Sequence, residues 1–324
     1  MSAYSKPGLA MILMAGSVLA AVEPALSQDA FKTFRQLDST AKMPKLNAFS
    51  PALGTAAPVA RDVKMQAKLT ADGPAMKTGL SWRVFSPDPG PDGKLPLVAS
   101  AEGGDANFQL APGSYFVNVA FGRAGVTKRL NVPASGNVPA ELLVLDAGGI
   151  VLNAISGEDH RVPATKLKFS IYSSEVREDG ERPLVMADVK PNTIVRLNAG
   201  NYHIVSEYGD VNASVRADVQ VEAGKLTEAT LQHHAAQVSF KLVSQHGGEA
   251  VADTAWSVLT AGGDVVAESV SAFTSMVLTE GDYTVVARNK EKIYQKDFNV
   301  QTGRDVDVEV LMKEQQAISV NDTE

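Results

Sequence analysis

The stretch "LAPGSYFV" at residues 110–117 places an apolar residue before a turn with one glycine, and an aromatic-rich run after it. The same pattern returns as "LNAGNYHI" at 197–204 and as "LTEGDYTV" at 278–285. The shared form is Leu-x-x-Gly-x-Tyr-x-Val/Ile, and its tyrosines are Tyr115, Tyr202 and Tyr283. Spacings of 87 and 81 residues between these tyrosines predict a threefold internal repeat.

Other positions keep the same register. An aromatic residue recurs at intervals of 87 residues upstream of the motif: Trp82, Phe169 and Trp256. A valine lies 17 residues after each tyrosine and precedes a glycine turn: Val132, Val219 and Val300, with Gly136, Gly224 and Gly303. The interval from aromatic to tyrosine is 33 residues in the first two copies and 27 in the third, so we predict that the third copy lacks six residues in its middle.

The repeat divides the chain into units the size of small autonomous domains, which are too long for solenoid repeats. We predict units at 61–147, 148–235 and 236–313, a linker at 28–60 and a polar tail at 314–324. The linker is rich in Ala, Pro and Ser, and its "AFKTFRQLD" stretch allows one short helix. That helix is interpreted as a frayed helix or a packed strap, with a docking peptide as the alternative.

Hydrophobic residues inside a unit alternate with a period of two. Phe108 and Leu110 alternate with polar residues before the turn, and Tyr115, Val117 and Val119 do so after it. Gly, Asp, Asn and Pro separate such runs, as is typical of short strands. The pattern predicts an all-β chain of three tandem antiparallel β-sandwich domains, each with its recurring aromatic in the core.

Residues 61–313 contain three copies of one arrangement. Each copy has a motif related to F-x-L-x-x-G-x-Y-x-V, then a strand that ends near a glycine, and then a last valine-rich strand. It resembles the carboxypeptidase-regulatory-like and collagen-adhesin B-type families, which have transthyretin-like or immunoglobulin-like sandwiches. The resemblance implies secreted, non-catalytic β-modules that serve as spacers, stalks or interaction surfaces.

The N-terminal segment at 1–27 has the pattern of a secretory signal, with Lys6, the short apolar core "GLAMILMAGSVLAAV" and small residues before Gln28. The alternative is an uncleaved anchor helix. The chain contains no cysteine, which excludes disulfides and thiolate chemistry. A net charge of −7 disfavours binding to nucleic acid. We predict a periplasmic or secreted protein without a membrane span after signal cleavage.

Catalytic signatures are absent from the sequence. None of the five histidines has HExxH spacing, and GxSxG, Walker A and GxGxxG patterns do not occur. The pair His233-His234 falls at a unit boundary, and because adjacent strand residues point to opposite faces, we interpret it as a solvated linker pair rather than a metal site. The loop "PDPGPDG" at 87–93 is interpreted as a turn, with calcium binding as the alternative. We therefore predict no catalytic, metal or cofactor site.

The repeated motif matches a tyrosine corner. Leu110 ends one strand, Gly113 permits the tight turn, and Tyr115 opens the next strand with its hydroxyl directed at a backbone group a few residues upstream. Gly200 and Gly281 occupy the position of Gly113 in the other two copies.

We predict a non-enzymatic envelope protein that acts as a spacer, scaffold or interaction module with another envelope protein as partner. The alternative is a module that binds a carbohydrate or another ligand, with Tyr208 and Tyr294 as the rings for sugar stacking. An enzyme whose site has no sequence signature is the third hypothesis.

Overall fold

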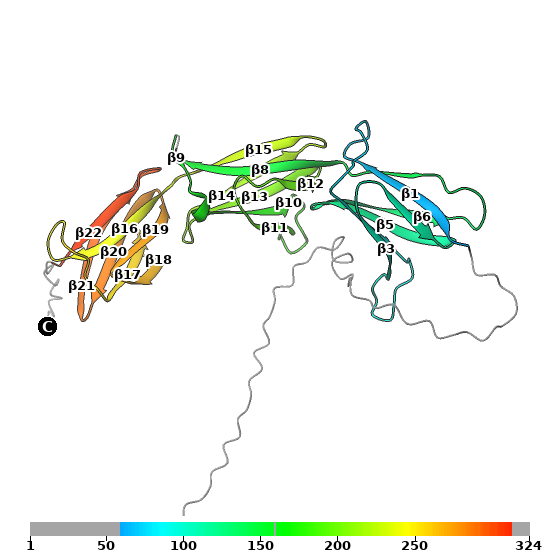
Figure 1. Cartoon of the computed structure of the whole chain (residues 1–324). Helices are drawn as coiled ribbons and strands as arrows, with labels where there is room; N and C mark the ends of the chain where they lie inside the picture. The colour runs from blue at the N-terminus through cyan, green and yellow to red at the C-terminus, as the bar shows by residue number, and fades with distance from the viewer. Residues whose placement is uncertain (1–58, 159, 313–324) are drawn as a thin grey trace, which may run out of the picture.

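The computed structural model describes residues 59–158 and 160–312, and these residues form three β-sandwich units in a row (Figure 1). The predicted all-β class with tandem sandwiches is confirmed. The predicted signal segment, the linker with its helix and the polar tail lie outside the described residues, apart from Val59 and Ala60. No helix in the described part of the chain is long and apolar enough to cross a membrane.

Each unit contributes seven main strands. Unit 1 has β1 (Arg61–Lys68), β2 (Leu80–Phe85), β3 (Leu97–Gly103), β4 (Ala106–Leu110), β5 (Gly113–Phe121), β6 (Ala124–Val132) and β7 (Glu141–Val144). Unit 2 has β8 (Ala147–Ser156), β10 (Leu167–Ser173), β11 (Leu184–Val189), β12 (Val195–Asn198), β13 (Gly200–Tyr208), β14 (Ser214–Val221) and β15 (Leu226–His233), with the short β9 (His160–Arg161) and a 3-10 turn (Ala164–Lys166) added. Unit 3 has β16 (Ala235–Val243), β17 (Thr254–Thr260), β18 (Val265–Val270), β19 (Phe273–Thr279), β20 (Gly281–Asn289), β21 (Lys292–Val300) and β22 (Val306–Leu311).

The three units share one topology. A three-stranded sheet places the fourth and seventh strands on either side of the first, as in β4-β1-β7, β12-β8-β15 and β19-β16-β22. The facing sheet follows the order third, second, fifth, sixth, as in β3-β2-β5-β6. The fully antiparallel arrangement expected from the sequence is therefore wrong at one place per unit, because the last strand pairs parallel to the first. The two strands lie at opposite ends of the unit sequence, so no hairpin signal marks their pairing.

Three hydrophobic clusters occupy the described chain, one between the two sheets of each unit. Trp82, Phe169 and Trp256 lie in the three clusters and are almost completely buried. Both indole nitrogens donate to backbone carbonyls, that of Trp82 to Gly104 and that of Trp256 to Ser271, each at 2.8 Å. The recurring aromatic thus packs in the core while its polar atom is satisfied.

The tyrosine corner is present in units 1 and 2. The hydroxyl of Tyr115 donates to the carbonyl of Ala111 at 2.9 Å, and that of Tyr202 donates to the carbonyl of Asn198 at the same distance. The preceding glycines have φ values of 155°, 151° and 148° at Gly113, Gly200 and Gly281, a region that only glycine occupies readily. A side chain at Gly113 or Gly200 would have room, so backbone conformation accounts for the glycine.

The sequence alignment of the valines is wrong in unit 2. Val132 and Val300 pair with Gly113 and Gly281, but the residue that pairs with Gly200 is Val221 rather than Val219. The hairpin between β13 and β14 is longer than its counterparts, which moves the register by two residues. The six residues missing from unit 3 fall in the hairpin that joins its second and third strands, where 261–264 replaces the longer 174–183 of unit 2.

Candidate functional site: the junctions between the units

Very short connections join the units. Two residues, Leu145 and Asp146, separate β7 from β8, and one residue, His234, separates β15 from β16. At the first connection the amide of Leu145 donates to the carbonyl of Lys68 at 2.9 Å, and the amide of Ala147 donates to that of Leu69 at 3.2 Å. Hydrogen bonds therefore hold the connection to unit 1, unlike a flexible linker, whose backbone is solvated.

The first junction packs a hairpin of unit 1 on the fourth strand of unit 2. A Cβ added to Gly122, at the tip between β5 and β6, would lie 3.0 Å from the Cβ of Arg196 on β12. The amide of Arg123 donates to the carbonyl of Arg196 at 3.1 Å. The Arg196 guanidinium lies 4.5 Å from the centre of the Phe121 ring, a cation–π contact between the units.

The side chain of Asn198 makes three hydrogen bonds across the first junction. Its side-chain oxygen accepts from the amide of Gly125 at 3.1 Å, and its amide nitrogen donates to the carbonyls of Gly125 at 3.2 Å and Leu145 at 2.8 Å. One side chain of unit 2 therefore bridges the hairpin and the connecting segment of unit 1. These hydrogen bonds join unit 2 to two separate points of unit 1.

The second junction repeats this arrangement with other residues. A Cβ on Gly209, in the hairpin between β13 and β14, would lie 2.7 Å from the Cβ of Val277 on β19. Asn212 of the same hairpin accepts from the amide of Thr279 at 3.1 Å and donates to the hydroxyl of Tyr283 at 3.1 Å. The Tyr283 hydroxyl also bonds the Thr279 side chain at 2.8 Å, so the third tyrosine connects two units.

In both junctions the hairpin between the fifth and sixth strands of one unit packs on the fourth strand of the next unit. The two-residue extension of the unit 2 hairpin supplies Asn212, which explains why the valine register differs there. The corresponding turn of unit 3 is Lys290–Glu291, which contains no glycine and carries both charges. This turn therefore lacks the glycine that packs on the following unit at the two junctions.

A buried polar cluster lies beside the second junction, where the predicted solvated histidine pair is wrong for one member. His233 is only 1% exposed, whereas His234 is exposed and lies 3.8 Å from Glu280. The Nε2 of His233 shares a 2.8 Å hydrogen bond with the hydroxyl of Ser206, and its Nδ1 has no hydrogen-bond partner in the described structure. The hydroxyl of Ser156 donates to the carbonyls of His233 and Ala235.

The hydrogen bond between Ser206 and His233 resembles that between a catalytic serine and its general base, but the pair is closed to solvent. Both side chains are buried, so no substrate reaches the serine hydroxyl. Burial, and to a smaller extent the neighbouring His234, lowers the pKa of His233 to about 4. The neutral ring stacks edge-on against Tyr208, with 5.8 Å between ring centres. The pair is a structural element of unit 2 at its boundary with unit 3.

The remaining histidines are dispersed. His203 pairs with Asp218 at 2.8 Å, His246 pairs with Glu309 at 3.2 Å, and His160 is exposed at the edge of unit 2. Glu309 also accepts from Lys241, and these hydrogen bonds lower its pKa to about 2. Among residues 59–158 and 160–312, no three His, Asp or Glu side chains gather as a metal site requires.

The two tyrosines expected to stack on sugars are buried, which makes that assignment wrong. Tyr208 is 2% exposed and Tyr294 is 6% exposed, because both point into a sandwich from strand positions whose cross-strand partners are also apolar. In the described part of the chain Phe273 is the one exposed residue among Phe, Tyr and Trp. A single ring does not form a stacking platform for a glycan.

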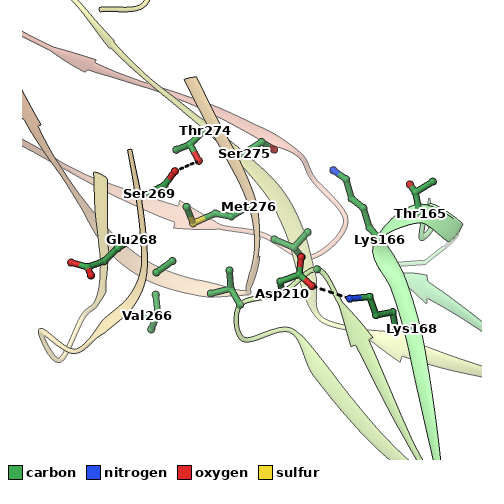
Figure 2. Close-up of a pocket in the computed structure, with 14 residues that line it drawn as sticks. Thr165, Lys166, Lys168, Asp210, Val266, Glu268, Ser269, Thr274, Ser275 and Met276 are labelled. Carbon is green, nitrogen blue, oxygen red and sulfur yellow. Dashed lines mark hydrogen bonds and ion pairs between the residues drawn. The ribbon is translucent and has the colours of Figure 1, made fainter. Parts of the chain in front are cut away.

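A groove of about 510 Å³ opens beside the second junction (Figure 2). One wall comes from unit 2, through Lys166, Lys168 and the hairpin at 209–211. The other wall comes from unit 3, through the edge strands β18 and β19 at 266–269 and 274–277. Lys168 pairs with Asp210 at 3.3 Å, and the hydroxyl of Thr274 bonds that of Ser269 at 3.1 Å.

Sequence reasoning missed the junction residues Gly122, Arg196, Asn198, Gly209 and Asn212. For Gly122, Gly209 and Asn212 the signal was present only as hairpin tips, "FGRAG" at 121–125 and "YGDVN" at 208–212, each with a glycine after an aromatic. The alignment of the three copies did not reveal that these tips contact the following unit.

The fold and its two junctions define a class: a tandem array of β-sandwich units with ordered, repeated contacts between neighbours. Residues 237–312, which span nearly all of unit 3, match the family model described as the Rhizobiales growth-associated tandem repeat domain. None of the curated protein sequences matches the chain.

Solved structures similar to the chain include the Bacillus anthracis TIE protein, at 15% identity and a TM-score of 0.23, over 78% of this chain and 51% of that one. The chain thus spans about half the length of the TIE protein. A streptococcal ancillary pilin matches at 11% identity and a TM-score of 0.28, over 79% of this chain and all of the pilin. The minor pilin of Streptococcus agalactiae matches at 12% identity and a TM-score of 0.28, over 53% of this chain and 95% of that chain.

Proposed function

We propose that the chain is a non-enzymatic, exported envelope protein that acts as a semi-rigid spacer and scaffold for another envelope protein. The observation that carries the proposal is the repeated junction, in which a glycine hairpin tip packs on the fourth strand of the next unit and an asparagine fixes the contact. Two such junctions with connections of two residues and one residue hold three sandwiches in a fixed row. A chain that binds a small substrate has no need for this length or for these ordered junctions.

Export, the periplasmic or secreted location and the relation to the carboxypeptidase-regulatory-like and collagen-adhesin B-type families belong to the same proposal. They are supported by the signal-like segment at 1–27 and by the threefold motif. The division into units at 61–147, 148–235 and 236–313 is supported by the three hydrophobic clusters. The family whose model matches 237–312 is described as growth-associated, which supports a role of the scaffold in growth.

A spacer depends on its length, so removal and replacement of the middle unit are expected to differ in effect. Cells that carry the chain without residues 148–234 are expected to grow as cells that lack the whole protein do. Cells that carry an unrelated β-sandwich of the same length in place of unit 2 are expected to grow as the wild type. Immunoblots of the envelope fraction control for abundance. Normal growth with the shortened chain, at equal abundance, would contradict the spacer role.

A further inference from the structure

The groove at the second junction borders two unpaired sheet edges. β18 is the last strand of one sheet of unit 3, and β19 is the last strand of the facing sheet. Both contribute to one wall of the groove, and the other wall comes from unit 2 (Figure 2). An edge strand presents backbone donors and acceptors to any segment that lies beside it, and such edges bind extended peptides.

The pairing register identifies the free backbone groups of β18. The amide of Ser271 donates to the carbonyl of Thr254 at 2.9 Å, and β17 pairs antiparallel with β18 through Trp256 and Ser269. Hydrogen-bonded and non-bonded pairs alternate along an antiparallel ladder. Glu268 and Val270 therefore direct their amides and carbonyls away from β17, and β18 has no other strand partner in the described structure.

Apolar side chains are exposed along the same edge. Val265 is 55% exposed at the junction end of β18, and Val270 is 77% exposed at its far end. Phe273, which starts β19 three residues after Val270, is 57% exposed. Natural sheet edges are usually protected by charges, proline or bulges. β18 carries one charge, Glu268, and one register shift near Val265, and its residues from Ala267 to Val270 pair regularly with β17. An added strand with apolar side chains would cover these residues.

The two ends of the groove differ in charge, with Lys166 at the junction end and Glu268 in the middle of β18. The ammonium group of Lys166 donates to the neutral side-chain oxygen of Gln237, and no carboxylate lies at ion-pair distance from it among the described residues. Its neighbour Lys168 is already paired with Asp210. A peptide carboxylate therefore fits beside Lys166 at the junction end, while Glu268 disfavours one in the middle of the strand.

The two junctions differ at the position that faces this space. At the first, the long side chain of Arg196 lies along Gly122 and over Phe121. At the second, the equivalent residue is the shorter Val277, which packs on Gly209 and lines the open groove. The second junction thus differs from the first in having a short side chain, that of Val277, where the first has Arg196, and this short side chain lines the groove.

We propose that this groove binds an extended segment of a partner protein, which adds to β18 as a further strand. The segment carries alternating apolar side chains over Val265 and Val270 and a carboxylate beside Lys166. This inference deepens the proposed scaffold role, because it names the surface and the chemistry of the partner. A second copy of the chain is disfavoured, because β18 pairing centred on Glu268 places two like charges opposite each other.

The test uses the mature full-length protein and a fluorescein-labelled synthetic peptide in which valine and threonine alternate and two aspartates stand at the C-terminal end. Fluorescence anisotropy is expected to show saturable binding. Glu268→Pro removes an outward amide that the fold does not use, and proline is tolerated on an edge strand. We expect it to weaken binding at least about tenfold, since strand addition depends on main-chain hydrogen bonds. The matched control Glu268→Gln keeps the amide and is expected to bind within about twofold of the wild type.

A second pair of variants tests the charge. Lys166→Gln is expected to weaken binding by about five- to tenfold, whereas Lys168→Gln, which removes a cation already paired, is expected to change it by less than about twofold. Because Lys166 lies in unit 2, this pair remains informative if Glu268→Pro unfolds unit 3, which thermal unfolding would detect.

Absence of saturable binding up to about 1 mM peptide would overturn the proposal, as would equal binding by the wild type and a folded Glu268→Pro. Dimerisation in sedimentation experiments that Glu268→Pro abolishes would assign the edge to a second copy instead, and would also overturn it. Each of these outcomes leaves the growth test of the spacer untouched, so failure of the groove and failure of the spacer are distinguishable.

Discussion

Replacement of Trp256 by alanine is expected to destabilise unit 3 by about 3–5 kcal/mol. The indole is 1% exposed, packs 5.9 Å from the Phe240 ring and donates to the carbonyl of Ser271. Its loss leaves a cavity and an unpaired carbonyl, and both raise the cost. Urea unfolding of the full chain, followed by hydrogen exchange in β17 and β20, measures the change.

Trp256→Phe is the matched control, because unit 2 has Phe169 at the equivalent core position. We expect this variant to cost about 1–2 kcal/mol, since most of the apolar contact remains and one hydrogen bond is lost. The fluorescence of Trp82, the only other tryptophan, reports on unit 1 and is expected to keep its transition. A loss below about 1 kcal/mol in Trp256→Ala would contradict the assignment of this residue to the core.

Acidification is expected to weaken the chain through His233. The pKa of this side chain is about 4 in the folded protein, against the ordinary value of 6.5, so the unfolded chain binds the proton more readily. Stability is therefore complete above about pH 6.5 and falls as the pH drops toward 4, by up to about 3 kcal/mol. Urea midpoints measured across this window test the effect.

His233→Gln is expected to remove the pH dependence between pH 6.5 and 4, although it lowers stability at neutral pH. His234→Gln, which changes the exposed neighbour, is expected to keep most of it. The ring that packs against His233 is Tyr208, and burial raises the pKa of its hydroxyl, so this group stays protonated throughout the window. Glu309 titrates lower, because its pKa is about 2 and its contribution is lost only as the pH falls from about 4.5. Parallel pH profiles for the wild type and His233→Gln would refute the role of His233.

Much of the fold is predictable from sequence, because its strongest signals are local and repeated three times. The alternation around Leu110 and Tyr115 predicts strands, and recurrence of the motif locates the units. The core positions of Trp82, Phe169 and Trp256 follow from the same register. These features depend on residues close in sequence, because hydrophobic periodicity and turn-forming residues can be recognised in a short segment.

The features that escaped prediction depend on contacts between distant segments. The parallel pairing of β22 with β16 joins the two ends of a unit. The burial of Tyr208 and His233 depends on which face of β13 and β15 meets the core next to the following unit. The role of Asn198 requires a hairpin 73 residues away. The hairpin of unit 2 is two residues longer than that of unit 1. For this reason the valine equivalent to Val132 is Val221, and not Val219 as the sequence spacing indicates.

The junctions are expected to hold the three units in one fixed arrangement, which distances between spin labels in neighbouring units can measure. The chain has no cysteine, so pairs of cysteines introduced at exposed positions label selectively. Val98 and Ile194 span the first junction, and Ile194 and Ile293 span the second. We predict a narrow distance distribution for each pair by pulsed electron–electron double resonance, broadened at the first junction by Asn198→Ala and at the second by Asn212→Ala. Broad distributions in the chain with both asparagines intact would show that the junctions do not fix the units.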